Sequence, residues 1–320
     1  MHLEIGPLRV GKPRVGIALG SGSARGWAHI GVLKELEAAG IEIDIVTGTS
    51  AGGVIGSFFA ADAIEHAEEF AAKYKSPRVT LSYMDFSVAS GGLIGGKRFV
   101  GFLEEYLPVR KFSELKRSFG VVATDLSSMQ EVHISDGALI PAVRATVAVP
   151  GFLSPEVFGD YQLVDGGLLN PIPVSLARKL GADIVIAVDL DAHAVREKAE
   201  GVTGIMYRTI DTMMNRIRLE NFKSHPADIT IEPVLRDYGF LDFHRSPEAI
   251  EEGRRAARAA LPQIRKTLSR PLSRSSRLLF NPGSIPDALR NLAFRSESDR
   301  SNKAGAIAQA ESSEADSQKQ

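Results

Sequence analysis

Ser50 is the residue whose surroundings most clearly suggest chemistry. It stands in Gly48-Thr49-Ser50-Ala51-Gly52, a G-x-S-x-G pattern between a predicted strand and a predicted helix. In a tight strand-to-helix turn, the residues two before and two after the serine come together, so a side chain at Gly48 or Gly52 would clash. The turn also places the hydroxyl at a helix N-terminus, where unpaired N–H groups favour negative charge. The pattern indicates a nucleophilic serine, with an ordinary turn and N-cap serine as the alternative.

A serine hydroxyl is a poor nucleophile unless a base lies beside it. The chain contains seven histidines. The order serine, acid, histidine that is typical of α/β-hydrolases would nominate His193, His225 or His244. That fold places several strands before its serine turn, whereas here we expect one strand before the strand that carries Ser50. We therefore predict that the histidines are structural or lie at the surface.

A glycine-rich loop follows the first predicted strand, at residues 20–26 (GSGSARG). Small residues there let the backbone approach a ligand and direct N–H groups toward it. A dinucleotide site is one interpretation, but the acid that would bind the ribose is missing at the end of the second predicted strand. An oxyanion hole is another, and a plain helix-entry turn is a third. Because loops after neighbouring parallel strands meet at one sheet edge, we expect this loop to face Ser50.

The third chemical element is Asp165, which ends a predicted strand and is followed by Gly166 and Gly167. An acid in this position is held in a tight loop rather than on a flexible surface. Taken alone, it is typical of an aspartate that stabilises its own turn.

Alternating strands and helices must position these three elements. The hydrophobic pattern predicts strands over residues 14–19, 43–48, 118–124, 130–135, 161–164, 183–189 and 227–231. It predicts helices over residues 27–39, 52–61, 139–146, 173–180, 203–223 and 246–268. Strand–helix alternation of this kind favours a parallel sheet with helices on its faces.

Composition excludes several classes of function. The 320 residues carry 38 basic and 39 acidic side chains, so the net charge of −1 gives no overall attraction to nucleic acid. The absence of cysteine excludes disulfides, thiolate metal sites and a cysteine nucleophile. No metal or nucleotide cofactor is indicated. We find no signal peptide and no apolar run of about 20 residues, so we expect a cytoplasmic protein.

The composition changes near residue 269. We expect an N-terminal tail over residues 1–13, one folded domain over 14–268, a basic and partly apolar segment over 269–295, and a disordered tail over 296–320. Within the third segment, residues 270–295 are a candidate for peripheral contact with an anionic membrane surface. A solvated tail with a docked helix is the alternative.

Together, these motifs resemble the patatin-like phospholipase family, and within it the bacterial subgroup related to neuropathy target esterase. The matching stretches are GSGSARGWAHIGVLKELEAAGIEID (20–44), GTSAGG (48–53), AVPGFLSP (148–155), LVDGGLLNPIPV (163–174) and GADIVIAVDL (181–190). The resemblance runs from about residue 14 to about residue 268. It implies a three-layer α/β/α fold with a mostly parallel central sheet.

The resemblance also implies a lipid acyl hydrolase that uses a Ser–Asp dyad and no histidine. Ser50 would be the nucleophile and Asp165 the general base, with an acyl-enzyme between the two half-reactions. Backbone N–H groups of the stretch Ser21, Gly22 and Ser23 would form the oxyanion hole. Arg25 and Gly26 match the end of the family's loop, where we expect Arg25 to brace the loop.

This chain departs from the family pattern G-G-G-x-R-G at Ser21 and Ser23, which stand at the first and third glycine positions. A serine held at positive φ would cost roughly 1 kcal/mol. The implied substrate is a lipid or another carboxylic ester, and neither the head group nor the oligomeric state is indicated. An acyltransferase that uses the same dyad and a regulatory or adaptor protein that keeps the fold are the alternatives.

Overall fold

The computed structural model describes residues 12–74, 76–78, 92–94, 96–195, 198–239 and 241–270. Most of the predicted N-terminal tail, nearly all of the basic segment and the whole C-terminal tail lie outside these residues.

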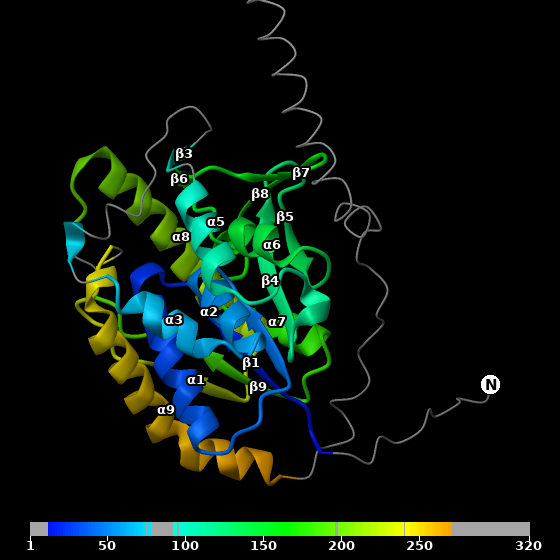
Figure 1. Ribbon diagram of the computed structural model, residues 1–320. Coiled ribbons are helices and arrows are strands. Elements are labelled where there is room, and N and C mark those ends of the chain that lie inside the picture. The colour runs from blue at the N-terminus through cyan, green and yellow to red at the C-terminus, as the bar shows by residue number, and fades with distance from the viewer. Residues whose placement is uncertain are drawn as a thin grey trace, which may run out of the picture.

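An eight-stranded sheet forms the centre of the described chain, in the order β10-β9-β1-β2-β4-β8-β7, with β5 also paired to β4 (Figure 1). Its strands are β1 (Val15–Leu19), β2 (Ile45–Gly48), β4 (Ser118–Asp125), β5 (Gln130–Ile134), β7 (Glu156–Phe158), β8 (Tyr161–Asp165), β9 (Ile184–Val188) and β10 (Ile229–Ile231). The five strands from β10 to β4 are mutually parallel. The strands β5, β7 and β8 add antiparallel pairings on the β4 side. A separate short parallel pair joins β3 (Gly92–Ile94) to β6 (Gly151–Leu153).

Helices cover both faces of this sheet. Alternate residues of β1 point to opposite sides: Val15, Ile17 and Leu19 join the larger core, and Ala18 joins the smaller one. The helices on the larger-core side are α1 (Ala28–Ala38), α2 (Ala51–Ala60), α3 (Ile64–Ala71), α5 (Lys97–Tyr106), α6 (Leu139–Thr146) and α9 (Ser246–Leu268). The other side is covered by α7 (Val174–Lys179) and the C-terminal part of α8 (Gly201–Ser224). The predicted three-layer α/β/α fold with a mostly parallel sheet is therefore confirmed (Figure 1).

The predicted elements match closely in place, and the helices over 139–146 and 246–268 match to the residue. The described residues add four short 3-10 helices: η1 (Ser23–Trp27), η2 (Phe112–Glu114), η3 (Gly166–Leu168) and η4 (Phe243–Arg245). The first of these lies inside the glycine-rich stretch, which the sequence suggested would be a loop before the helix. The sequence analysis also missed α3, α5, β3, β6 and β7.

Two glycines allow α1 and α9 to touch backbone to backbone. A Cβ at Gly31 would lie 1.8 Å from the carbonyl oxygen of Ile250, and a Cβ at Gly253 would lie 2.0 Å from that of Ala28. Backbone atoms cannot move aside as a flexible side chain can. Glycine at this crossing therefore sets how closely the two outer helices pack.

We predict that Gly253→Ala destabilises the fold by about 1–3 kcal/mol, because the added methyl group forces α9 away from α1. The matched control is Gly101→Ala in α5, where a Cβ would meet nothing within 4 Å. That variant should gain up to about 1 kcal/mol from the better helix propensity of alanine. Urea unfolding of both proteins tests this, and equal stability changes would contradict it.

Candidate active site

Ser50 occupies a strained turn between β2 and α2. Its backbone has φ 55° and ψ −123°, a left-handed region that non-glycine residues rarely adopt. A Cβ at Gly48 would lie 2.3 Å from the carbonyl oxygen of Gly52, and a Cβ at Gly52 would lie 2.1 Å from that of Leu19. The two glycines thus permit the close backbone approaches that hold Ser50 in this conformation.

Thr146, at the end of α6, holds the backbone of this turn. Its hydroxyl accepts the Ser50 N–H at 3.0 Å and donates to the carbonyl oxygen of Val122 at 2.5 Å. Thr146 is fully buried. Sequence reasoning missed this residue, because no motif marks a threonine at a helix end as the partner of a distant turn.

Asp165 ends β8 directly beside the Ser50 turn, and its carboxyl group is almost fully buried. The oxygen Oδ1 accepts the Gly167 N–H at 2.8 Å. The oxygen Oδ2 makes no hydrogen bond of ordinary geometry within the described chain. The hydroxyl of Ser50 lies near enough to this carboxyl group to lower its pKa.

Burial dominates the electrostatics of Asp165. It raises the pKa of the carboxyl group to about 7, although the hydrogen bonds from Ser50 and from the Gly167 N–H lower it. The carboxyl group is therefore divided between its acid and its carboxylate near neutral pH. A group with this pKa can both take up and release a proton there.

Sheet topology explains how two residues so far apart in the sequence meet. The strand β4 lies between β2 and β8, pairing Thr47 with Gly120 on one side and Asp165 with Ala123 on the other. Gly166 turns the chain against β4, where a Cβ would lie 2.2 Å from the carbonyl oxygen of Val122.

The segment after Asp165 then braces the site through its backbone carbonyl groups. Thr47 Oγ1 donates to Pro173 O at 3.0 Å, and Thr49 Oγ1 donates to Asn170 O at 2.8 Å. The Ser21 N–H donates to the carbonyl of Pro171, between them, at 2.9 Å. One short segment therefore fixes both the Ser50 turn and the glycine-rich loop.

This last hydrogen bond corrects one expectation about the loop. Because the Ser21 N–H is occupied by Pro171 O, it is not available to an oxyanion in this structure. Gly22 and Ser23 are the other two residues of the expected oxyanion stretch. Ser23 has φ 49°, so the strain anticipated for a serine at a glycine position falls on Ser23 and not on Ser21.

Arg25, Gly26 and His29 support the loop from within. Arg25 forms a buried ion pair with Asp191 at 2.8 Å, which ties the loop to the segment after β9. Gly26 lies against Ala51, whose Cβ would be 2.4 Å from a Cβ at position 26. His29 Nε2 lies 2.8 Å from Gly20 O, and burial lowers the pKa of this histidine to about 4. At neutral pH, His29 is therefore an uncharged donor that holds the start of the loop.

The described residues contain no cluster of three or more side chains suited to a metal ion. In the same part of the chain, no helix combines the length and the apolar character needed to cross a membrane.

Comparison with known proteins now places this arrangement in a family. The family model described as patatin-like phospholipase matches residues 17–178. The chain belongs to the patatin-like phospholipase family. This confirms the resemblance noted in the sequence, and with it the prediction of a carboxylic ester hydrolase.

Several curated relatives cover most of this chain. An uncharacterized NTE family protein of Mycobacterium tuberculosis is 28% identical over 332 residues, covering 78% of this chain and 91% of that protein. Another from Mycobacterium bovis is 31% identical over 281 residues, covering 79% of this chain and 47% of that protein. A lysophospholipase of Emericella nidulans is 28% identical, covering 81% of this chain and 19% of the fungal protein.

Among solved structures, VipD from Legionella pneumophila aligns with a TM-score of 0.44 at 12% identity, covering 79% of this chain and 67% of VipD.

We predict that Thr146→Val destabilises the protein by about 1–3 kcal/mol, because it leaves the Ser50 N–H and the Val122 carbonyl buried without their partner. Because valine has nearly the same shape as threonine, the loss of stability reports on the hydroxyl group alone. Thr146→Ser retains the hydroxyl and should recover part of that stability. Thermal and urea unfolding measure the effect, and a valine variant as stable as the wild type would contradict it.

Proposed function

We propose that this protein hydrolyses carboxylic esters of lipids through a Ser50–Asp165 dyad and an acyl-enzyme. The observation that carries the proposal is the buried Asp165 carboxyl group, which interacts with the hydroxyl of a serine in a strained strand-to-helix turn. Its pKa of about 7 suits a group that must accept and return a proton.

In the first half-reaction, Ser50 Oγ attacks the ester carbonyl carbon while Asp165 takes the hydroxyl proton. The carbonyl oxygen becomes an oxyanion as the new C–O bond forms. When the intermediate collapses, the bond to the leaving alcohol breaks and protonated Asp165 returns the proton to that alcohol. The acyl group is then joined to Ser50 as an ester.

In the second half-reaction, Asp165 takes a proton from a water molecule as its oxygen attacks the acyl carbon. Collapse of this intermediate breaks the bond to Ser50 Oγ, which regains a proton from Asp165. The products are a carboxylic acid and the original enzyme. No metal or redox group takes part in this scheme.

The backbone N–H groups of Gly22 and Ser23 are the proposed oxyanion donors, since the loop faces the Ser50 turn and the Ser21 N–H is occupied. Their fixed positions would stabilise charge only as it develops on the substrate oxygen. Arg25 acts on this loop through Asp191 and is proposed as a positioning residue.

A lipid substrate is supported by the family and by the fungal lysophospholipases that this chain resembles at 28–29% identity. Of the residues after the AVP stretch, half-buried Phe152 stacks edge to face on Tyr207 of α8 at 5.9 Å between ring centroids. This apolar contact lies on β6, a few residues after α6, whose last residue Thr146 contacts the Ser50 turn. An acyl chain bound there would need cover from water.

We predict that Ser50→Ala and Asp165→Asn each lower turnover of p-nitrophenyl esters and lysophospholipids by roughly 10⁴-fold, because each removes one member of a coupled pair. The control is Ser57→Ala, a buried serine of α2 that hydrogen-bonds only locally, to Val54 O. A fluorophosphonate probe should label the wild type and the control but not Ser50→Ala. Retained turnover in Ser50→Ala would refute the proposal, and an unlabelled wild type would favour a regulatory protein.

The pH dependence follows from the raised pKa of Asp165. The carboxylate is the form that takes the serine proton, so kcat/KM for an uncharged ester should rise about tenfold per pH unit below the pKa and level off above it. We expect the midpoint near pH 7, in line with the pKa of about 7. Stopped assays between about pH 5 and about pH 9 measure this profile, and a midpoint near that of a free aspartate, about pH 4, would contradict it.

A further inference from the structure

Helix α8 exposes large apolar side chains on the side that an ordinary surface helix fills with polar residues. Its exposed side carries large apolar residues, with Val202 81% exposed, Ile205 57% exposed and Met213 52% exposed. Met206 is exposed as well. These positions are spaced by three, four and seven or eight residues, so they form one stripe along the outer side of the helix.

Two charged residues of α8, Asp211 and Arg218, face inward, although Arg216, Glu220 and Lys223 toward its C-terminal end are exposed. Arg218 is buried and pairs with buried Asp189 at the end of β9. Asp211 is also buried. Asn221, on the same side, donates to the carbonyl oxygen of Leu169 at 2.9 Å. The inner side of the helix therefore includes buried polar contacts, while the exposed apolar residues of its outer side are left uncovered by the described residues.

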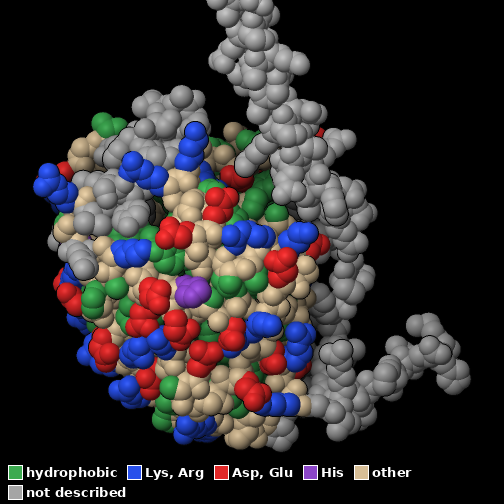
Figure 2. Space-filling model, in the orientation of Figure 1, with side chains coloured by type: hydrophobic (Ala, Val, Ile, Leu, Met, Phe, Trp, Pro, Cys, Tyr) green, Lys and Arg blue, Asp and Glu red, His purple; other side chains and the backbone are tan. Residues whose placement is uncertain are grey.

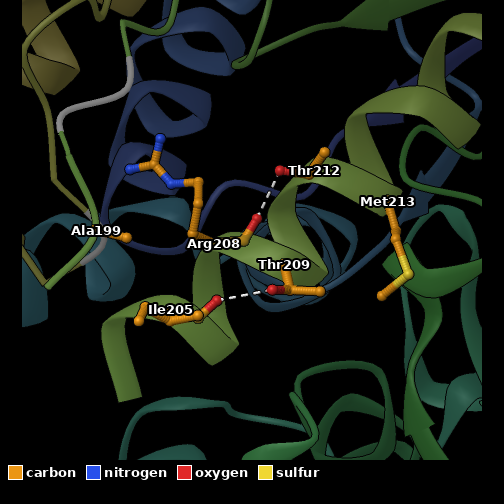
Figure 3. A pocket seen from close by; sticks show the side chains of 6 residues that line it. All are labelled: Ala199, Ile205, Arg208, Thr209, Thr212 and Met213. Carbon is orange, nitrogen blue, oxygen red and sulfur yellow. Dashed lines mark hydrogen bonds between the residues drawn. The ribbon is translucent and has the colours of Figure 1, made fainter. Parts of the chain in front are cut away.

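The two threonines in this stripe do not make it polar. Thr209 Oγ1 donates to Ile205 O at 2.9 Å, and Thr212 Oγ1 donates to Arg208 O at 2.7 Å (Figure 3). Because both hydroxyl groups are satisfied within the helix, they can enter an apolar medium at little cost. An open pocket of about 290 Å³ lies on the same side, lined by the residues labelled in Figure 3.

This stripe adjoins the candidate active site. On the side of α8 facing the protein, Met214 packs against Gly167, two residues after Asp165. Tyr207 stacks on Phe152 of β6, and Met206 reaches Gly151. A medium touching the outer side of α8 would thus lie one helix away from the Asp165 loop.

The size of the stripe favours a lipid surface over another protein. Residues 202–213 span about 18 Å of helix, and a helix is about 10 Å wide, which gives an area on the order of 200 Å². A stable protein interface needs about 800 Å² on each partner. By contrast, acidic and basic side chains mix over the face formed by α1, α3 and α9 (Figure 2). A few apolar side chains on one helix suffice for contact with a lipid aggregate.

We propose that the outer side of α8, from Val202 to Met213, is the surface through which this enzyme rests on a lipid aggregate. The inference rests on the proposed function, because it supplies the route by which an insoluble ester reaches the dyad. The partner is the apolar boundary of a phospholipid surface. Contact depends on side-chain burial and not on a cluster of cationic residues.

The test uses the full-length protein and vesicles of phosphatidylcholine. The variant Ile205→Asp/Met213→Asp should reduce vesicle co-sedimentation by at least about tenfold, because two side chains that would be buried in lipid become charged. The matched control is Ala259→Asp/Gln263→Asp, which adds the same charge to exposed positions of α9. The control should bind vesicles like the wild type.

Two further measurements separate this inference from the proposed function. Turnover of water-soluble p-nitrophenyl acetate should be unchanged in the α8 variant, while turnover of vesicle-borne lysophospholipid falls with binding. Vesicle binding is also measured in Ser50→Ala, which reports on the surface without catalysis. Wild-type vesicle binding by the α8 variant would overturn the inference. The inference would also be overturned if the α8 variant changed from dimer to monomer and still bound vesicles, because the stripe would then contact a second copy of the chain.

Discussion

The backbone carbonyl groups between Asn170 and Pro173 hold the candidate site together. They accept hydrogen bonds from the side chains of Thr47 and Thr49 and from the N–H of Ser21. The two threonines lie just before Ser50 in the chain, and Ser21 belongs to the glycine-rich loop. Since the same segment begins just after Asp165, its position fixes all three chemical elements at once.

A second network, of buried ion pairs and a hydrogen bond, joins the glycine-rich loop to α8. Arg25 pairs with Asp191, whose N–H donates to Asp189 Oδ1 at 3.0 Å, and Asp189 pairs with Arg218. Burying these charges is tolerable only because each has a partner. Arg218 therefore lies on the inner side of α8, where its ion pair with Asp189 helps fix the loop, while Val202, Ile205 and Met213 lie on the outer side.

Much of the arrangement follows from the sequence because its motifs stand at strand ends. Ser50 and the glycine-rich loop each follow a short buried parallel strand, and the rule that parallel strands present their ends at one edge predicts that these two face each other. Asp165 ends β8, which is antiparallel to β4, so its place beside Ser50 was implied by the family resemblance alone. Thr146 could not be found in this way, since its role depends on where α6 ends relative to β2. The occupied Ser21 N–H was equally hidden, because the spacing of residues does not reveal the partner of a backbone group.

Most of the elements that the sequence analysis missed carry no clear local signal in the sequence. The strands β3, β6 and β7 have three residues each, too few to show an alternating pattern, and α3 follows α2 after a break of three residues without a proline or glycine. The sequence predicts α8 itself but not its orientation. Periodicity shows that a helix has two unlike sides, and only the fold decides which one faces inward.

The burial of Asp165 also makes the stability of the folded protein depend on pH. Its pKa is about 7 in the folded chain, against an ordinary value of 3.8. Because folding favours the protonated form, this residue's contribution to stability is complete below the unfolded value and is lost as the pH rises through about 7. The ionised form required of a base is thus the form that the folded interior disfavours, so a rise in pH toward about 7 increases the active fraction of the enzyme and lowers the stability of its fold together.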